Sequence, residues 1–456
     1  MKMKLTKLIL TLCVLSASAL NVFAASKVVT SSTTESNQSY DDSDTTTLSA
    51  LNVTTSGVTY TGTNITLSAT NNSTGGTAFG KGAYTNNAIL FLTGGTISTT
   101  GSLGHGINLT NASSGTVNNV NIKTTGFTGH GLAIGNSTLT LTGGSISATG
   151  SNGNGIYLYD AANATLNNVN IKTEGREGYG VFTQLGSTLT LIGGTISTSG
   201  IAGYALHLAN GSNDIVSGVT IATTGVSGHG VRAVSSTLTM TDSDISVTGN
   251  NAHALYIIAN STAAVDLNSN IITGNLFASG TSTITITGSN GSVITGDVSG
   301  ETSSTIGITL SDADTKLVGN VSRTADSEIN LTLGAGALFH GGGTLDNLTL
   351  ESGAIIGYAG NVLLVTDSIT IGEDITIDFS NLTETGEYTV FDWSGATGGE
   401  SISGEQFTVT GDGVAGTFSV ANNQLTFNAS AVPEPSTWFL IGAGLGALAL
   451  IRRRSS

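Results

Sequence analysis

A repeat of 24 or 25 residues governs the middle of this 456-residue sequence. Its clearest units are "LTGGTISTTGSLGHGINL", "LTGGSISATGSNGNGIYL" and "LIGGTISTSGIAGYALHL". An isoleucine recurs in every unit, and a glycine follows it by four residues. These isoleucines are Ile97, Ile122, Ile146, Ile171, Ile196, Ile221 and Ile245. A fixed period of this length is typical of solenoids, in which each unit packs only against its neighbours.

Each unit contains three short stretches in which apolar and polar residues alternate. In the unit around Ile146 they read "STLTL", "GSISAT" and "GIYL". Such alternation indicates half-buried β-strands. The Gly and Asn residues between them tolerate positive φ and supply the turns. Three strands and three turns in about 25 residues correspond to one coil of a right-handed parallel β-helix.

The pattern changes outside this region. Gly274, Gly296, Gly319 and Gly341 are 22 or 23 residues apart, which predicts tighter coils. After Leu345 the repeat fades, and hairpin-like stretches predict a cap that closes the solenoid end. We therefore expect an all-β chain in six segments: a signal peptide (1–24), a Ser/Thr-rich leader (25–58), coils of 24 or 25 residues (59–262), coils of 22 or 23 residues (263–345), a β cap (346–431) and a sorting tail with a short transmembrane helix (432–456).

The N-terminus has the order of a secretory signal. Lys2, Lys4 and Lys7 precede an apolar run, and "VFA" fits the small-x-small rule, which predicts cleavage after Ala24. The only cysteine, Cys13, lies inside this segment. The exported chain is therefore expected to fold without disulfides.

The charge balance excludes one class of partner. The formal net charge is −16, and residues 25–431 contain 8 Lys and Arg against 29 Asp and Glu. Nucleic acids are held by basic side chains that neutralise phosphates. We therefore expect no nucleic-acid partner.

The C-terminal tail holds both prolines of the chain, Pro433 and Pro435. Proline removes a ladder hydrogen bond, so its absence from the coils agrees with a β-helix. The 14 residues 438–451 are mostly apolar and span about 21 Å as a helix, which is short for a bilayer core of about 30 Å. Basic residues after such a segment favour the cytoplasmic side.

This tail resembles the PEP-CTERM sorting signal. The matching residues are Val432, Pro433, Glu434, Pro435, Arg452, Arg453 and Arg454. The resemblance implies processing by an exosortase in a Gram-negative envelope, a transient inner-membrane anchor, and association with extracellular polysaccharide or biofilm. The coils, with "ISTTGSLGHGINL" and "VITGDVSG", resemble the β-helical passenger domains of autotransporter adhesins.

A first column of candidate residues follows the conserved spacing of "GHG". It contains Lys81, His105, His130, Asn154, Tyr179, Tyr204, His229 and His253. A catalytic histidine occupies one place, whereas this column recurs in each unit, and the paired carboxylates of a glycoside hydrolase do not accompany it. We interpret it as a structural ladder at a corner of the coils, with a metal site at His105 and His130 and catalysis as alternatives.

A second column occupies the outward position between paired apolar residues. After Asn108 and Ala133 it reads Tyr157, Phe182, His207, Arg232 and Tyr256. We expect an exposed aromatic row, which could stack on sugar rings or shield strand edges.

The sequence contains two weaker patterns. Threonine rows beside the anchor isoleucines suggest an ice-binding face, but Lys172, Glu174 and Asp244 interrupt them. Acidic pairs such as Asp312 and Asp314 suggest weak Ca²⁺ binding or a solvated face.

These observations predict an exported structural or adhesin-like protein of the cell surface or matrix. No catalytic, cofactor or metal residue is assigned, and no enzymatic activity is expected. The alternative is a polysaccharide-binding or polysaccharide-degrading protein on the same scaffold.

Overall fold

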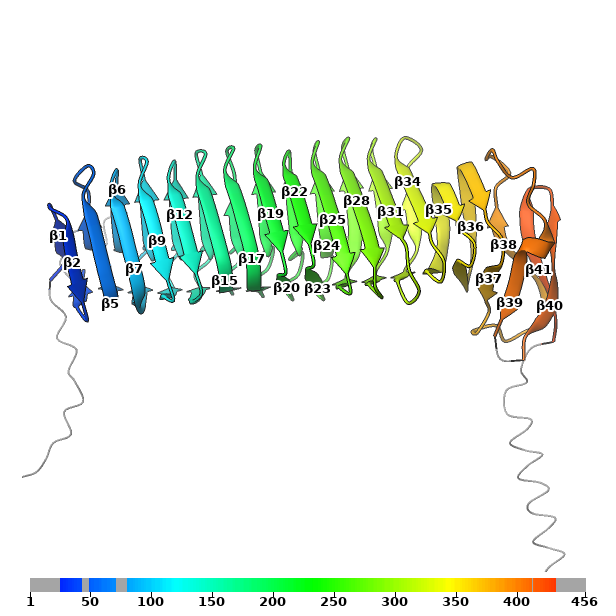
Figure 1. The fold of residues 1–456 in the computed structure, drawn as a ribbon, viewed down its shortest axis with the longest axis horizontal. Helices are drawn as coiled ribbons and strands as arrows, with labels where there is room; N and C mark the ends of the chain where they lie inside the picture. The colour runs from blue at the N-terminus through cyan, green and yellow to red at the C-terminus, as the bar shows by residue number, and fades with distance from the viewer. Residues whose placement is uncertain (1–24, 43–48, 71–79, 412, 432–456) are drawn as a thin grey trace, which may run out of the picture.

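The chain winds into one long parallel β-helix. The computed structural model describes residues 25–42, 49–70, 80–411 and 413–431. Its strands belong to a single sheet system in which each strand pairs with the equivalent strand one coil later (Figure 1). The predicted all-β solenoid is therefore confirmed.

The strands of the first half follow one another around successive coils in chain order. They are β1 (Lys27–Val29), β2 (Thr33–Ser36), β3 (Ser39–Asp41), β4 (Ser49–Val53), β5 (Thr59–Ala69), β6 (Lys81–Asn86), β7 (Ile89–Thr99), β8 (Ile107–Thr110), β9 (Ser114–Asn118), β10 (Asn121–Thr124), β11 (Leu132–Gly135), β12 (Thr138–Thr142), β13 (Ser145–Ala148), β14 (Ile156–Tyr159), β15 (Asn163–Thr173), β16 (Val181–Thr183), β17 (Thr188–Thr198), β18 (Leu206–Ala209), β19 (Asn213–Ser217), β20 (Thr220–Thr223), β21 (Val231–Val234), β22 (Thr237–Thr241), β23 (Asp244–Val247) and β24 (His253–Ile258).

The second half continues to the C-terminal cap. Its elements are β25 (Thr262–Asn268), β26 (Ile271–Thr273), β27 (Asn275–Ser279), β28 (Thr283–Ser289), β29 (Val293–Thr295), β30 (Val298–Glu301), β31 (Thr305–Leu310), β32 (Lys316–Val318), β33 (Val321–Arg323), β34 (Glu328–Leu333), β35 (Leu338–Leu350), β36 (Ile355–Ile371), β37 (Ile375–Asp378), β38 (Gly386–Asp392), the short 3₁₀ helix η1 (Gly404–Gln406), β39 (Phe407–Thr410), β40 (Ala415–Ala421) and β41 (Gln424–Ala431).

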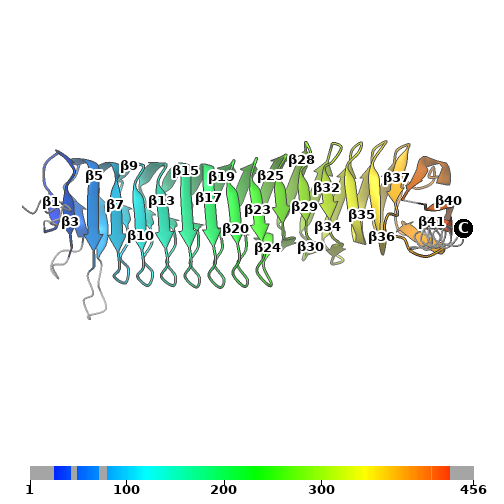
Figure 2. The ribbon, with the colours of Figure 1, turned by 90° about the horizontal axis from the view of Figure 1, so that it is seen from below.

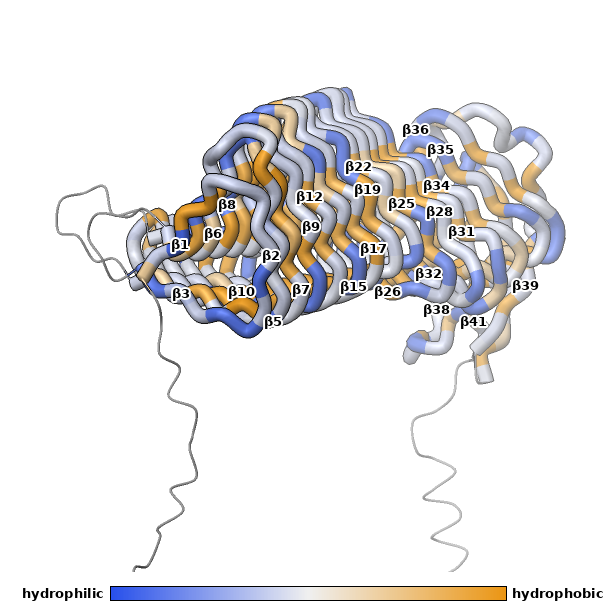
Figure 3. Tube along the Cα trace, turned by 60° about the vertical axis from the view of Figure 1, so that its left-hand side comes forward, coloured by the Kyte–Doolittle hydropathy of each residue, from blue (hydrophilic) through white to orange (hydrophobic). Residues whose placement is uncertain are grey.

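The coil around Ile146 shows how the sequence pattern becomes a core. Every second residue of β12 and β13 is buried, including Leu139, Leu141 and Ile146, while the residues between them face solvent or are half-buried. Ile146 pairs in register with Ile122 on one side and Ile171 on the other. Figure 3 shows hydrophobic positions aligned in rows from coil to coil. Each such side chain contributes about 1.5–3 kcal/mol by leaving water.

The predicted leader differs from the structure. Residues 27–41 form strands of the first coil, since β1 pairs with β4, and β2 and β3 pair with β5. Val29 and Tyr40 fill its interior, whereas the Ser and Thr residues that suggested disorder mostly face outward. Glu35 receives hydrogen bonds from Lys27 at 2.7 Å and from Tyr60 at 3.1 Å, so polar groups close this end of the solenoid.

The predicted cap also begins later than expected. β36 pairs with β35 and β37 pairs with β36 in parallel, so coil geometry continues beyond residue 346. Antiparallel pairing is found only where β38 and β40 flank β41, within the part that the structure describes. The sequence repeat fades before the coils end. The later coils need only inward apolar residues such as Ile356 and Ile377 to continue the core, and these do not have to follow the repeat.

Two predicted segments lie outside the described residues. They are the signal peptide, with its cleavage site at Ala24, and the sorting tail with its transmembrane helix over 432–456. Among the residues that the structure does describe, no helix has the length and apolar character needed to cross a membrane.

Candidate functional site

The predicted corner column is a continuous stack of side chains. From His105 to His253, each member follows a turn that projects from one edge of the solenoid, and Figure 2 shows these turns as a row from β10 to β24. The rings of His105 and His130 are parallel, with centroids 4.9 Å apart and an interplanar angle of 3°. Tyr179 and Tyr204 stack in the same way at 4.9 Å.

Hydrogen bonds explain why His recurs in this column and why Asn154 can replace it in one coil. The backbone N–H of His130 donates to Nδ1 of His105 at 3.2 Å, and the N–H of Asn154 donates to Nδ1 of His130 at 3.0 Å. The N–H of Tyr179 donates to Oδ1 of Asn154 at 2.9 Å. A side chain of one coil thus satisfies a backbone donor of the next coil, which would otherwise be left unpaired.

Burial keeps these histidines neutral near pH 7. It lowers the pKa of His130 to about 4 and holds the pKa of His105 well below its usual range. Burial, with the charges of His253 and Arg232, lowers the pKa of His229 to about 3. Neutral imidazoles whose Nδ1 already accepts a hydrogen bond are suited to a structural ladder.

The second column packs against the first instead of standing free in solvent. His207 is 9% exposed, and Tyr157, Phe182 and Tyr256 are half-buried. Phe182 stacks on His207 with centroids 4.6 Å apart, and Tyr157 stacks on Phe182 at 5.3 Å. The prediction of an exposed row is therefore wrong in part.

The two columns join into one surface, which we call the aromatic strip. Its members are His105, His130, Tyr157, Tyr179, Phe182, Tyr204, His207, His229, Arg232, His253, Tyr256 and Phe277. Tyr179 meets His207 edge-on at 4.8 Å, and His229 lies flat against Tyr256 at 4.5 Å. The spacing of the repeats predicted both columns. It could not predict that a ring of the first column contacts a ring of the second column in the next coil, as Tyr179 contacts His207.

Arg232 is the cation of this strip. Its guanidinium lies 5.6 Å from the ring centroid of Tyr204, and its Nη1 lies 2.7 Å from Nε2 of His207. Within the described part of the chain, Arg232 forms no ion pair with a carboxylate. The side chain is held by aromatic faces and keeps charge available for a ligand.

The other candidate residues lie apart from the strip. Lys172 and Glu174 form an exposed ion pair at 2.6 Å on the face that carries the threonine rows. Asp312 accepts a hydrogen bond from the N–H of Asn290 at 3.2 Å. In the residues that the structure covers, no three His, Cys, Asp or Glu side chains gather as a metal site would require.

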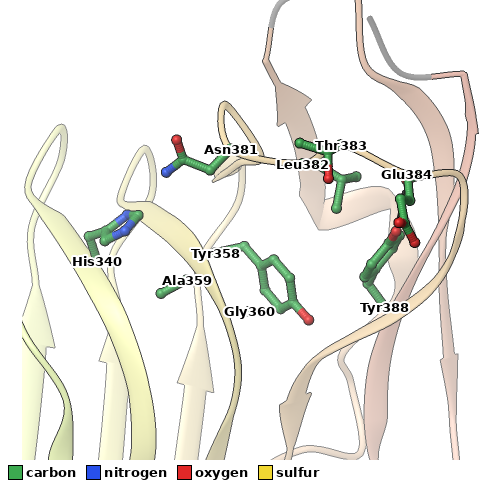
Figure 4. Close-up of a pocket in the computed structure, with 9 residues that line it drawn as sticks. All are labelled: His340, Tyr358, Ala359, Gly360, Asn381, Leu382, Thr383, Glu384 and Tyr388. Carbon is green, nitrogen blue, oxygen red and sulfur yellow. Dashed lines mark hydrogen bonds between the residues drawn. The ribbon is translucent and has the colours of Figure 1, made fainter. Parts of the chain in front are cut away.

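A pocket that sequence reasoning missed lies where the coils meet the cap (Figure 4). This cap pocket has a volume of about 370 Å³, and its polar and aromatic walls come from His340, Tyr358, Asn381, Thr383, Glu384 and Tyr388. Tyr358 and Tyr388 meet nearly edge-on, with centroids 6.0 Å apart and an angle of 71°. All of these residues except His340 come from stretches after Leu345, where the repeat fades, so no spacing rule brings them together.

Comparison with known protein families agrees with the fold and the tail. Residues 130–297 match the right-handed β-helix region, and residues 431–455 match the PEP-CTERM protein-sorting motif. A comparison with curated proteins finds no match. The sorting motif implies an exported protein that an exosortase processes, at the cell surface or in the extracellular space.

Proposed function

We propose that this exported β-helix protein is a non-enzymatic, adhesin-like rod of the cell surface or extracellular matrix that binds polysaccharide along its aromatic strip. The observation that carries this proposal is the strip itself. It runs over consecutive coils of a rigid solenoid, and its half-buried rings stack face to face with one another, so their outer edges are the part that meets solvent. The positive edges of aromatic rings and the hydroxyl groups of tyrosines can contact the oxygen atoms and hydroxyls of a sugar.

The geometry of the strip suits a polymer better than a small molecule. Its rings repeat at the spacing of neighbouring strands, about 4.8 Å, so an extended glycan can contact several coils at once. Arg232 adds a donor group without a carboxylate partner in the described chain, which favours hydroxyl or anionic groups of the polymer.

The C-terminal tail would direct the protein to the cell surface or matrix. In our proposal the apolar run and Arg452, Arg453 and Arg454 hold the chain in the inner membrane after export. An exosortase then processes the tail beside Pro433 and Pro435, and the rod joins the surface or the biofilm matrix.

A polysaccharide-binding assay tests the proposal. Purified protein is sedimented with a panel of insoluble bacterial and plant polysaccharides, and Phe182→Ala is compared with Phe91→Ala. Both residues are outward aromatics, but Phe91 lies on β7, away from the strip. We expect Phe182→Ala to weaken retention by about tenfold, since one aromatic contact contributes about 1 kcal/mol or more, and Phe91→Ala to bind normally.

Two results would count against the proposal. Equal retention of Phe182→Ala and the unaltered protein would show that the strip is not the binding surface. Soluble oligosaccharides released during the assay would show that the protein is an enzyme.

A further inference from the structure

The cap pocket is assembled from three separate parts of the chain. His340 comes from β35, Tyr358 from β36, and Tyr388 from β38, while Asn381, Thr383 and Glu384 come from the loop between β37 and β38. Its volume of about 370 Å³ falls within the range of about 300–1,000 Å³ that small-molecule sites occupy. The pocket is therefore large enough for one or two sugar rings.

Two tyrosine rings form a platform and a wall. Tyr358 is supported from behind by Phe379, whose ring centroid lies 5.2 Å away. Tyr388 meets Tyr358 at 71°, so a flat ligand lying on one ring touches the edge of the other. In the described chain the Tyr358 hydroxyl has no hydrogen-bond partner, and it remains available to a ligand.

The loop at the rim is held in place before any ligand arrives. The Tyr388 hydroxyl donates to the backbone carbonyl of Glu384 at 2.7 Å. At the start of the loop, the N–H of Ser380 donates to Oδ1 of Asp378 at 2.9 Å, and the N–H of Leu382 donates to the carbonyl of Phe379 at 2.8 Å. A loop that is already ordered loses less entropy on binding.

A glycine makes room for the third wall. A Cβ on Gly357 would lie 2.3 Å from Nδ1 of His340, so only glycine lets that imidazole lie across β36 beside the pocket. The ring lines the pocket on the side away from Tyr388, and Ala359 is drawn between it and the Tyr358 ring (Figure 4).

The charges around the pocket select against anionic ligands. Its lining contains the carboxylate of Glu384 and no Lys or Arg. The chain as a whole is acidic, with a net charge of −16. Carboxylate and amide groups form hydrogen bonds with neutral hydroxyls, and the carboxylate repels uronate, sulfate or phosphate groups.

We propose that the cap pocket binds a neutral pyranose, either a free sugar or the end of a polysaccharide chain, stacked on Tyr358 and hydrogen-bonded by Asn381, Glu384 and His340. This inference deepens the proposed function, because it names the sugar class that one end of the rod recognises. The pocket and the strip are separate surfaces, so each can be lost without the other.

Titration calorimetry of the full chain tests the pocket. Glucose, galactose, mannose and N-acetylglucosamine are compared with glucuronate, and the variants are Tyr358→Ala, Tyr358→Phe and Glu384→Gln. We expect saturable binding of at least one neutral sugar in the millimolar range. Tyr358→Ala should weaken it at least tenfold and Glu384→Gln several-fold, whereas Tyr358→Phe, which keeps the ring, should lose less than Tyr358→Ala.

The controls separate this inference from the proposed function. Phe182→Ala alters the strip only, so it should leave the titration unchanged. Glu384 is exposed, and its substitution keeps the fold even if Tyr358→Ala perturbs the cap. The pocket proposal is overturned if no neutral sugar binds at millimolar concentration, if glucuronate binds more tightly, or if the binding survives both Tyr358→Ala and Glu384→Gln. Retention on polysaccharide that depends on Phe182 would still support the strip in that case.

Discussion

At the scale of single residues, Asp214 places a carboxyl group in a largely apolar interior. It pairs in register with Leu189 and Leu238 of the neighbouring coils, and it is 1% exposed. The N–H of Leu189 donates to its Oδ1 at 3.2 Å, while Oδ2 has no partner in the described structure. Burial raises the pKa of Asp214 to about 8, so the side chain is largely protonated at neutral pH.

This raised pKa makes stability depend on pH in a defined direction. Below the ordinary carboxyl pKa of 3.8, both the folded and the unfolded chain carry the proton. Between pH 4 and pH 8 the unfolded chain releases it and the folded chain retains it, so the free energy of unfolding falls as pH rises. Above pH 8 both states are ionised, and the penalty becomes constant.

We therefore predict that Asp214→Leu stabilises the solenoid most at alkaline pH. The gain should be on the order of 2–4 kcal/mol at pH 8 and much smaller near pH 4. Melting curves of both proteins from pH 4 to pH 9 measure it, with Leu238→Ile as a control for altered packing. A difference that does not vary with pH would contradict the assigned ionisation.

At the scale of the coil, Asn and Gly alternate at one turn from Asn64 to Gly193 for a steric reason. The turn before each anchor isoleucine has a residue at positive φ, such as Asn119 at 52° and Gly143 at 63° in successive coils. A Cβ on Gly143 would lie 2.2 Å from Oδ1 of Asn119. At the next residue, Gly144, the neighbouring atom belongs to the backbone. A Cβ there would lie 2.2 Å from the carbonyl oxygen of Val120. The Asn119 side chain of one coil therefore occupies the space that the missing Cβ of Gly143 leaves in the next coil.

We predict that Gly144→Ala is much more damaging than Gly186→Ala. Both glycines have positive φ, 79° and 69°, but a Cβ at Gly186 meets no atom within 4 Å. Gly186→Ala should cost only the left-handed strain of about 1–2 kcal/mol. Gly144→Ala should cost about 3 kcal/mol or more, because the backbones of two coils must separate. Urea unfolding of the two variants measures the difference, and equal losses would contradict the close packing at this turn.

At the scale of the whole molecule, the rod is closed at both ends by different means. Lys27, Glu35 and Tyr60 place a hydrogen-bonded polar group at the N-terminal end. At the C-terminal end, buried rings such as Trp393, Phe379 and Phe427 fill the interior of the cap. Closed ends leave fewer unpaired strand edges on which other chains could pair, so a long parallel sheet can remain a defined rod. The tail begins where this closed body ends.

Sorting is tested on the tail. We predict that replacing Pro433 and Pro435 with alanine leaves an unprocessed protein held in the inner membrane, because the exosortase signal is lost. Cell fractionation and the mass of the C-terminal peptide measure the outcome, and Ser436→Ala in the same segment is the control. A double variant with normal tail mass and normal surface location would contradict the assigned signal.

The sequence predicted the coils well because their signal is local and repeated. The anchor isoleucines, from Ile97 to Ile245, pair in the register that their spacing predicted. The first coil was missed, since its few inward residues, Val29 and Tyr40, stand among Ser, Thr and Asp. The cap pocket was missed because Tyr358 and Tyr388 are brought together by coil stacking and by an antiparallel turn, not by a motif.

The sequence by itself determined the solenoid, the column positions, the lack of disulfides in the exported chain and the sorting motif. These features follow from periodicity and composition, which act between residues close in the chain or one repeat apart. Only the tertiary structure decided that the two columns share one aromatic strip, that Asp214 is buried without a full set of partners, and that a pocket forms at the cap. These features depend on how side chains of different coils and of the cap meet in space, and packing at that level is fixed by contacts that no single repeat contains.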